Sequence, residues 1–178
     1  EIDGPIFLTG FMGTGKTRIG RVLASRLRRV FLDTDRLVEE RTGLTISEIF
    51  ANEGEERFRQ LEHECVKEAA AHADAVVALG GGAITDQRNW EVIRAAGVLV
   101  ALEANLETIL KRVSRRNDRP LLAGLNRQQR RERIAALLKE RAPYYARADI
   151  RLRTRDKQTP EATSGELIRK MERWCEER

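Results

Sequence analysis

The chain has 178 residues and a net charge of +5, and 41% of its residues are hydrophobic, a composition typical of one folded domain rather than a disordered chain. Its longest apolar run, residues 95–102, falls far short of the ~20 residues that a membrane-spanning helix needs, and its first residues lack the basic and apolar segments of a secretory signal. The charge is uneven, because residues 111–155 carry a net +11 and the other 133 residues a net −6, so we expect an anionic ligand or a solvated Arg-rich helix there.

The pattern of apolar residues and helix caps predicts five strands that alternate with helices. In chain order we expect a strand at 5–9, a helix at 15–28, a strand at 30–32, a helix from the capping box at 45–48 to about 73 with a break near Gly54, a strand at 75–79, a helix at 87–96, a strand at 98–102, a helix at 106–115, a loop at 116–126, a helix at 128–146, a strand at 150–152 and a helix at 160–175. Strands separated by helices imply parallel crossovers, and the wholly apolar strands indicate a sheet that is covered on both faces. We therefore predict an α/β fold with three αβα layers around a five-stranded parallel sheet, in a single domain that spans residues 1–178.

A glycine-rich segment between the first strand and the first helix matches the P-loop pattern in full. It reads GFMGTGKT at residues 10–17, and its glycines let successive backbone N–H groups point inward at a phosphate. The pattern predicts that the lysine reaches the β- and γ-phosphates and that the next hydroxyl binds Mg²⁺. We expect the chain to bind a nucleoside triphosphate through Gly13, Thr14, Gly15, Lys16 and Thr17.

Two carboxylates follow the second strand, which we expect to lie beside the P-loop strand. Asp33 and Asp35 would then occupy the carboxyl edge of the sheet, where ligands bind in folds of this class. We expect one carboxylate to face the metal ion and the other to face an acceptor hydroxyl. The competing interpretation is that they only cap the helix that follows.

Three consecutive glycines, Gly80, Gly81 and Gly82, end the third strand and would let a ligand approach exposed backbone N–H groups closely. A plain tight turn is the alternative, but it would seldom need all three. Arg59 and Arg141 would be surface residues by default, because spacing alone cannot select them from the 27 arginines of the chain.

The assembled pattern resembles the shikimate kinase family from the first strand to the last helix. The resemblance is carried by GFMGTGKT at 10–17, DTD at 33–35, GEERFRQLE at 54–62, LGGGAI at 79–84, RPLLAG at 119–124 and ERAPYY at 140–145. It implies a fold like that of the nucleoside monophosphate kinases, with a mobile lid at about 116–126. It also implies a transferase that phosphorylates the 3-hydroxyl of shikimate with ATP and Mg²⁺, which gives shikimate 3-phosphate in aromatic amino acid biosynthesis.

The same resemblance implies a role for each candidate site residue. Lys16 would bind phosphate, Thr17 would bind Mg²⁺ directly, and Asp33 would hold the metal through water. Asp35 would be the general base on the acceptor hydroxyl. The shikimate molecule would be bound by Arg59, Arg141 and the backbone of Gly80, Gly81 and Gly82. The nucleotide would be contacted by Arg112, Arg119 and Gln158.

Three other functions fit parts of the pattern. A kinase of the same architecture could act on another small polyol such as gluconate, and a nucleoside monophosphate kinase would bind a phosphate acceptor. The basic segment could also serve a nucleic-acid-binding protein or a non-catalytic ATP-binding relative, but only 5% of the residues are aromatic, which leaves few candidates for base stacking. We therefore expect small-molecule partners, no nucleic acid and no membrane, in a cytoplasmic monomer whose Cys65 and Cys175 lack CxxC spacing.

Overall fold

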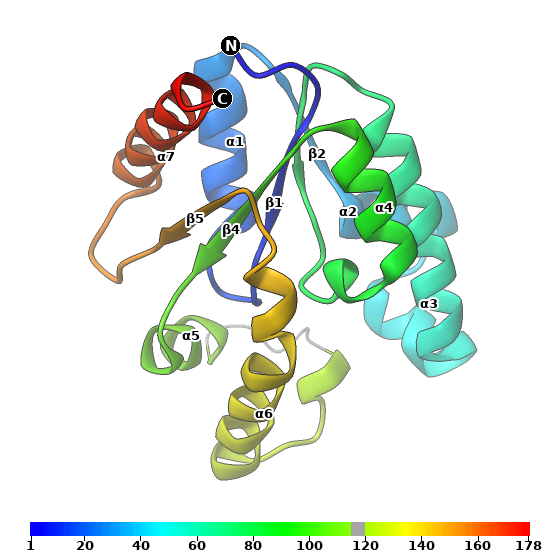
Figure 1. The fold of residues 1–178 in the computed structure, drawn as a ribbon. Coiled ribbons are helices and arrows are strands. Elements are labelled where there is room, and N and C mark those ends of the chain that lie inside the picture. Colours follow the sequence, from blue (N-terminus) through cyan, green and yellow to red (C-terminus); the bar gives the residue numbers. More distant parts are fainter. Residues whose placement is uncertain (115–119) are drawn as a thin grey trace.

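The fold is a parallel β-sheet between two layers of helices (Figure 1). The structure is a computed structural model and describes residues 1–114 and 120–178. The strands are β1 (Ile6–Thr9), β2 (Val30–Asp33), β3 (Ala75–Ala78), β4 (Val98–Glu103) and β5 (Ile150–Arg153). The helices are α1 (Lys16–Leu27), α2 (Thr34–Thr42), α3 (Ile46–Ala70), α4 (Gln87–Ala96), α5 (Leu106–Val113), α6 (Arg127–Tyr145) and α7 (Pro160–Glu176), with short 3₁₀ turns η1 (Ala83–Thr85) and η2 (Pro120–Leu122). None of these helices is long and apolar enough to cross a membrane.

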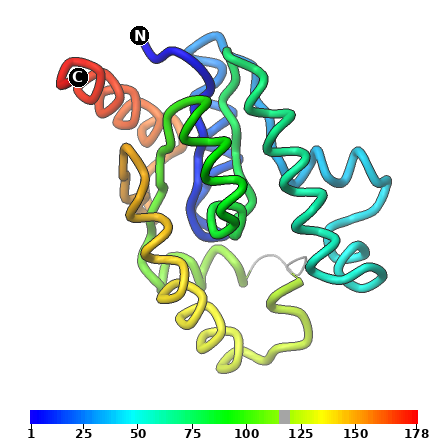
Figure 2. Tube along the Cα trace, turned by 45° about the vertical axis from the view of Figure 1, so that its right-hand side comes forward, coloured from blue at the N-terminus to red at the C-terminus, as the bar shows by residue number. Residues whose placement is uncertain are grey.

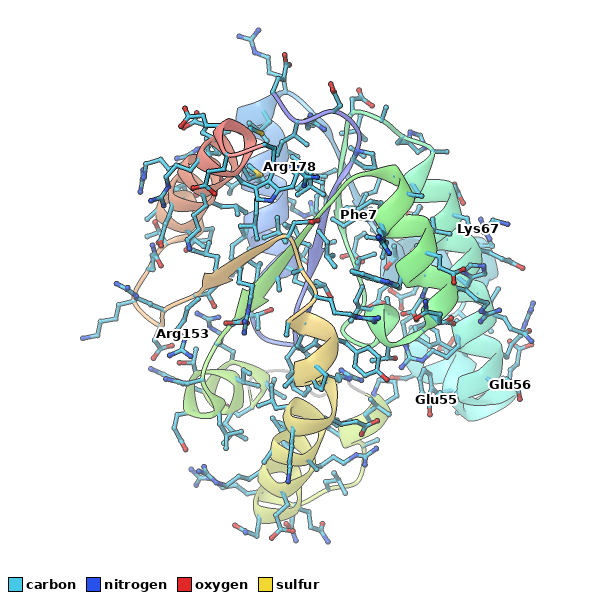
Figure 3. All side chains as sticks on the ribbon, viewed as in Figure 1. Phe7, Glu55, Glu56, Lys67, Arg153 and Arg178 are labelled. Atoms are coloured by element: carbon cyan, nitrogen blue, oxygen red, sulfur yellow. The ribbon has the colours of Figure 1, made fainter. Side chains whose placement is uncertain are left out.

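Successive strand residues point to opposite faces of the sheet and pack into two apolar cores, one on each face. Ile6 and Leu8 of β1 pack with α1 and α7, whereas Phe7 between them packs with the helices of the other face. Phe7 is fully buried at the centre of the molecule (Figure 3). The prediction of a five-stranded parallel sheet in three layers is therefore confirmed.

The strand order differs from the expected one in one respect that matters for the site. The order is β2-β3-β1-β4-β5, so β3 separates β2 from the P-loop strand β1, and the expectation that these two are neighbours is wrong. Asp33 is paired in register with Ala78, the last residue of β3. As a result, the segment after β2 lies directly beside the glycines that follow β3.

The sequence pattern does not predict helix α2, but it correctly predicts the break in α3. Helix α2 begins directly after Asp33 and ends at Gly43, which has a φ of 69°. Its apolar period is weak, because only Thr34 and Val38 are buried, and this explains why periodicity does not reveal it. Within α3, Gly54 has φ 84° and ψ 171°, so the helix is broken where the sequence predicts a break.

The carboxyl ends of the strands point toward α5 and α6, and both chain ends lie at the opposite end of the sheet (Figure 2). Parallel strands bring their carboxyl ends to one edge, so the P-loop after β1, the segment after β2 and the glycines after β3 meet there. This edge positions the candidate site.

Candidate active site

The turn between β1 and α1 has the geometry of a P-loop. Gly10 has a φ of 146°, and a Cβ at this position would lie 2.3 Å from the Leu102 carbonyl oxygen, so only glycine fits. Gly15 occupies the N-cap position of α1 without any side-chain cap, which leaves the first helical N–H groups available to an anion. The Lys16 Nζ donates to the Gly10 carbonyl oxygen at 2.5 Å and to that of Phe11 at 3.0 Å, so this cation lies over the loop that would hold phosphate.

Thr17 and Asp33 form a pair of oxygen donors beside the P-loop. The Thr17 hydroxyl donates to Asp33 Oδ2 over 3.1 Å. The other carboxylate oxygen, Oδ1, accepts the N–H groups of Asp35 and Arg36 at the start of α2. Asp33 therefore combines the two roles that the sequence suggested as alternatives. One carboxylate oxygen caps α2, and the other faces Thr17, where a metal ion is expected.

This pair fits a magnesium ion that nucleotide phosphates help to hold. Hydroxyl and carboxylate oxygens are ligands that Mg²⁺ prefers, and one or two protein oxygens suffice when phosphates and water complete its octahedron. The described residues contain no cluster of three or more His, Cys, Asp and Glu side chains that could hold a metal without a substrate.

Asp35 lies in the first turn of α2, and not at the end of the strand as the sequence suggested. On an extended strand it would share a face with Asp33, so the start of the helix is what directs the two carboxylates to different places. A Cβ on Gly80 would lie 2.7 Å from Asp35 Oδ1 and 2.8 Å from Glu62 Oε2. Thr34 links the start of α2 to Gly80, because its hydroxyl accepts a hydrogen bond from the Gly80 N–H at 3.1 Å.

Two guanidinium groups converge on the other end of the glycine triplet. A Cβ on Gly82 would lie 2.7 Å from Arg59 Nη2 and 3.1 Å from Arg141 Nη2, although the two arginines come from α3 and α6. Arg141 is only 5% exposed and has no carboxylate partner among the described residues. A buried and unpaired positive charge is costly, so this arrangement favours an anionic ligand between the two side chains.

Glu62 is a site residue that the sequence analysis missed. It is 1% exposed, its Oε1 accepts from Arg59 Nη1 at 2.8 Å, and its buried Oε2 has no partner among the described residues. Burial raises the pKa of Glu62 to about 7 against the opposing effect of Arg59, and the nearby Asp35 carboxylate adds to the rise. The available signal was the motif GEERFRQLE, in which Glu62 follows Arg59 by three residues and so shares its helix face.

Replacing Glu62 by Gln is expected to change how stability depends on pH. A carboxyl whose pKa is raised in the folded state stabilises the fold while it is protonated, and this contribution is lost as the pH rises from about 4.5 through about 7. The native protein should therefore lose on the order of 2 kcal/mol of unfolding free energy between pH 5.5 and pH 8 that the Gln variant keeps. Urea unfolding of both proteins at the two pH values measures this difference.

A matched control is Glu55→Gln, because Glu55 also pairs with Arg59 but its side chain is 56% exposed. Its stability should follow the pH profile of the native protein. A Glu62→Gln profile that runs parallel to the native one would contradict the placement of a protonated carboxyl at this position.

Of the three residues expected on the nucleotide side, Arg112 contacts the P-loop directly. Arg112 Nη1 donates to the Gly13 carbonyl oxygen at 2.9 Å and to the Thr154 hydroxyl at 3.3 Å, which ties the P-loop to the segment after β5. Gln158 lies in that segment, where its Nε2 donates to Glu166 while its buried Oε1 has no partner among the described residues. Arg119 lies outside the described residues.

The strand, P-loop and helix, together with the carboxylates and guanidinium groups that surround the adjoining glycine triplet, define a P-loop phosphotransferase with a fold like that of the nucleoside monophosphate kinases. A model of the shikimate kinase family matches residues 12–172. A shikimate kinase of Moorella thermoacetica is 47% identical over 175 residues, which are 98% of each chain. One of Geobacter sulfurreducens is 46% identical over 152 residues, which cover 85% of this chain and 82% of the relative.

Solved structures agree with these relatives. The shikimate kinase of Acinetobacter baumannii in complex with shikimate has a TM-score of 0.90 at 36% identity and covers 96% of this chain and 93% of its own. The enzyme of Bacteroides thetaiotaomicron has a TM-score of 0.88 at 32% identity, with 96% and 99% covered. The chain belongs to the shikimate kinase family, whose members phosphorylate shikimate with ATP in aromatic biosynthesis.

Proposed function

We propose that the chain transfers the γ-phosphoryl group of ATP to the 3-hydroxyl of shikimate, with shikimate 3-phosphate and ADP as products. The observation that supports this most strongly is the division of the glycine triplet, because Gly80 faces Asp35 and Glu62 whereas Gly82 faces Arg59 and Arg141. Shikimate has hydroxyls at one side of its ring and a carboxylate at the other, so the Asp35 side and the two-arginine side of the triplet match the two ends of the molecule.

Asp35 is the general base in this proposal. It takes the proton from the 3-hydroxyl while that oxygen forms a bond to the γ-phosphorus and the bond to the β–γ bridging oxygen breaks. Arg59 and Arg141 hold the carboxylate through guanidinium hydrogen bonds, with the Gly81 and Gly82 N–H groups beside them. Fixing both ends of the acceptor places its hydroxyl for in-line attack, which is the main source of rate in phosphoryl transfer.

The P-loop binds the nucleotide through Gly13, Thr14 and Gly15, and Lys16 neutralises charge on the β- and γ-phosphates. Thr17 would hold Mg²⁺ directly and Asp33 through water, and the ion, when bound, offsets phosphate charge. Arg112 and Gln158 border the nucleotide. Arg119 would reach the transferring phosphate from a lid over about 116–126, by the family resemblance alone.

We also propose that the chain forms a single domain, works as a monomer in the cytoplasm and acts on small molecules. Both cysteines are free thiols, which is compatible with a reducing compartment where ATP is supplied.

A coupled ADP-release assay tests this function with purified protein, Mg²⁺ and a panel of acceptors. Shikimate should be phosphorylated, chelation of Mg²⁺ should stop the reaction, and NMR of the product should place phosphate on the 3-oxygen. Faster turnover of gluconate, AMP, CMP or UMP would contradict the proposal, and so would phosphate on another hydroxyl.

A further inference from the structure

Tyr145, the last residue of α6, joins two parts of the acceptor site that come from distant segments of the chain. Its side chain is only 6% exposed, and its hydroxyl donates to the Gly81 carbonyl oxygen over 2.7 Å. This bond connects α6 with the middle residue of the glycine triplet, 64 positions earlier in the sequence. No element of the site described above uses this hydroxyl.

The same hydroxyl lies next to Arg141. Arg141 precedes Tyr145 by four residues on α6, so both side chains share one helix face. Burial raises the pKa of the Tyr145 phenol, while the positive charge of the nearby Arg141 opposes that rise. The phenol proton is donated to the Gly81 carbonyl, and Arg141 Nη1 also lies beside Gly81, 3.2 Å from where its Cβ would be, so the phenol oxygen faces this cation as an acceptor and not as a donor.

Arg141 is held on its other side by the P-loop. Its guanidinium lies over the Phe11 ring, 5.4 Å from the ring centroid, and Phe11 is 1% exposed. Among the described residues, no ion pair holds Arg141, so the position of its guanidinium depends on the Phe11 ring below it and on its other neighbours, which include Gly81 and Tyr145.

The bond to the Gly81 carbonyl also orients backbone donors. In a trans peptide the C=O and the following N–H point in opposite directions, so fixing the Gly81 oxygen turns the Gly82 N–H away from Tyr145. Neither the Gly81 nor the Gly82 N–H is bonded to another described residue. Both donors are free for an anion at the place where Arg59 and Arg141 converge.

We propose that Tyr145 is a positioning residue for the acceptor carboxylate, which holds Arg141 and the Gly81–Gly82 peptide in the arrangement that binds this anion. The proposal rests on the proposed function, because it takes the group between Arg59 and Arg141 to be the shikimate carboxylate. Tyr145 acts through its neighbours and has no contact of its own with the reacting atoms.

The test is Tyr145→Phe, which removes one oxygen and keeps the buried ring. The KM for shikimate should rise about fivefold to tenfold, while the KM for ATP and kcat stay within about twofold of native values. The melting temperature should fall by about 2–4 °C, because one buried hydrogen bond is lost. With the methyl ester of shikimate, which lacks the negative charge, the variant and the native protein should differ little. A purely structural role would not produce this split between substrates.

Tyr144→Phe is the matched control. Tyr144 is the neighbouring residue on α6, its ring lies beside Arg147 at 5.1 Å, and its hydroxyl has no hydrogen bond to the described residues. Its kinetics should be those of the native enzyme.

The outcomes separate this inference from the proposed function. An unchanged KM for shikimate in Tyr145→Phe, or an equal rise for shikimate and ATP, overturns the role of Tyr145 if Arg141→Leu still weakens shikimate binding. If Arg141→Leu also leaves shikimate binding unchanged, the carboxylate site itself is wrong, and the inference falls with it.

Discussion

Replacing Asp35 by Asn is expected to lower kcat for shikimate by about a thousandfold while ATP still binds. Asn has nearly the same shape and fits the space that Gly80 leaves beside Asp35, but its amide cannot take a proton from the acceptor hydroxyl. Loss of a general base typically costs 10²- to 10⁴-fold, so about a thousandfold is the middle of that range. The coupled ADP assay gives kcat, and calorimetric titration with ATP gives the affinity.

Glu40→Gln is a suitable control for Asp35→Asn. Glu40 lies on the same helix, α2, and its exposed carboxylate pairs with Arg36. Its kcat should be native. A kcat within tenfold of native in Asp35→Asn would show that this carboxylate is not the base.

Replacing Arg141 by Leu is expected to raise the KM for shikimate by about thirtyfold and to leave the melting temperature unchanged or higher. Loss of hydrogen bonds from a charged donor to a carboxylate costs about 2 kcal/mol, which corresponds to that factor. The free protein buries this guanidinium at 5% exposure without a carboxylate among the described residues, so an apolar side chain of smaller size removes an unfavourable charge. Kinetics and thermal unfolding of the same preparation measure both effects.

The opposite directions of these two effects distinguish a binding role from a folding role. Arg133→Leu, an exposed position on the same helix, should change neither the KM nor the melting temperature noticeably. An Arg141→Leu protein that is clearly less stable and binds shikimate normally would identify Arg141 as a structural residue.

Local signals in the sequence were enough to predict the P-loop and most elements of the fold. The glycines, lysine and threonine at 10–17 must stand at fixed spacing between a strand and a helix, and the structure has β1 and α1 on either side of them. The break of α3 at Gly54 can likewise be predicted locally, because glycine readily adopts the positive φ that ends a helix.

Features that depend on contacts between distant segments could not be predicted in this way. The insertion of β3 between β1 and β2 is decided by how the whole sheet assembles, and it is this order that brings Asp35 next to Gly80. From the sequence, Glu62 looks like an ordinary surface glutamate and Tyr145 like an ordinary core tyrosine. Only the fold reveals that one is buried against Arg59 and that the other bonds Gly81.

The excess of positive charge in residues 111–155 also takes on a more specific meaning. Arg131 pairs with Glu107 and Arg151 with Glu103 on exposed surface, where such pairs contribute little to stability. Arg112 and Arg141 instead point at the P-loop and at the glycine triplet. The basic segment therefore combines solvated surface with two arginines at the site, which supports a small anionic ligand more than a polyanion.

In the proposed function, the hydroxyls of shikimate lie at the Asp35 side of the glycine triplet and its carboxylate lies at the side of Arg59 and Arg141. A crystal structure of the protein with ADP and shikimate tests it most directly. We predict that the shikimate carboxylate lies within hydrogen-bond distance of Arg59 and Arg141 and that the 3-hydroxyl lies within hydrogen-bond distance of Asp35. Shikimate bound in the reverse orientation, or with its carboxylate away from both arginines, would contradict the account.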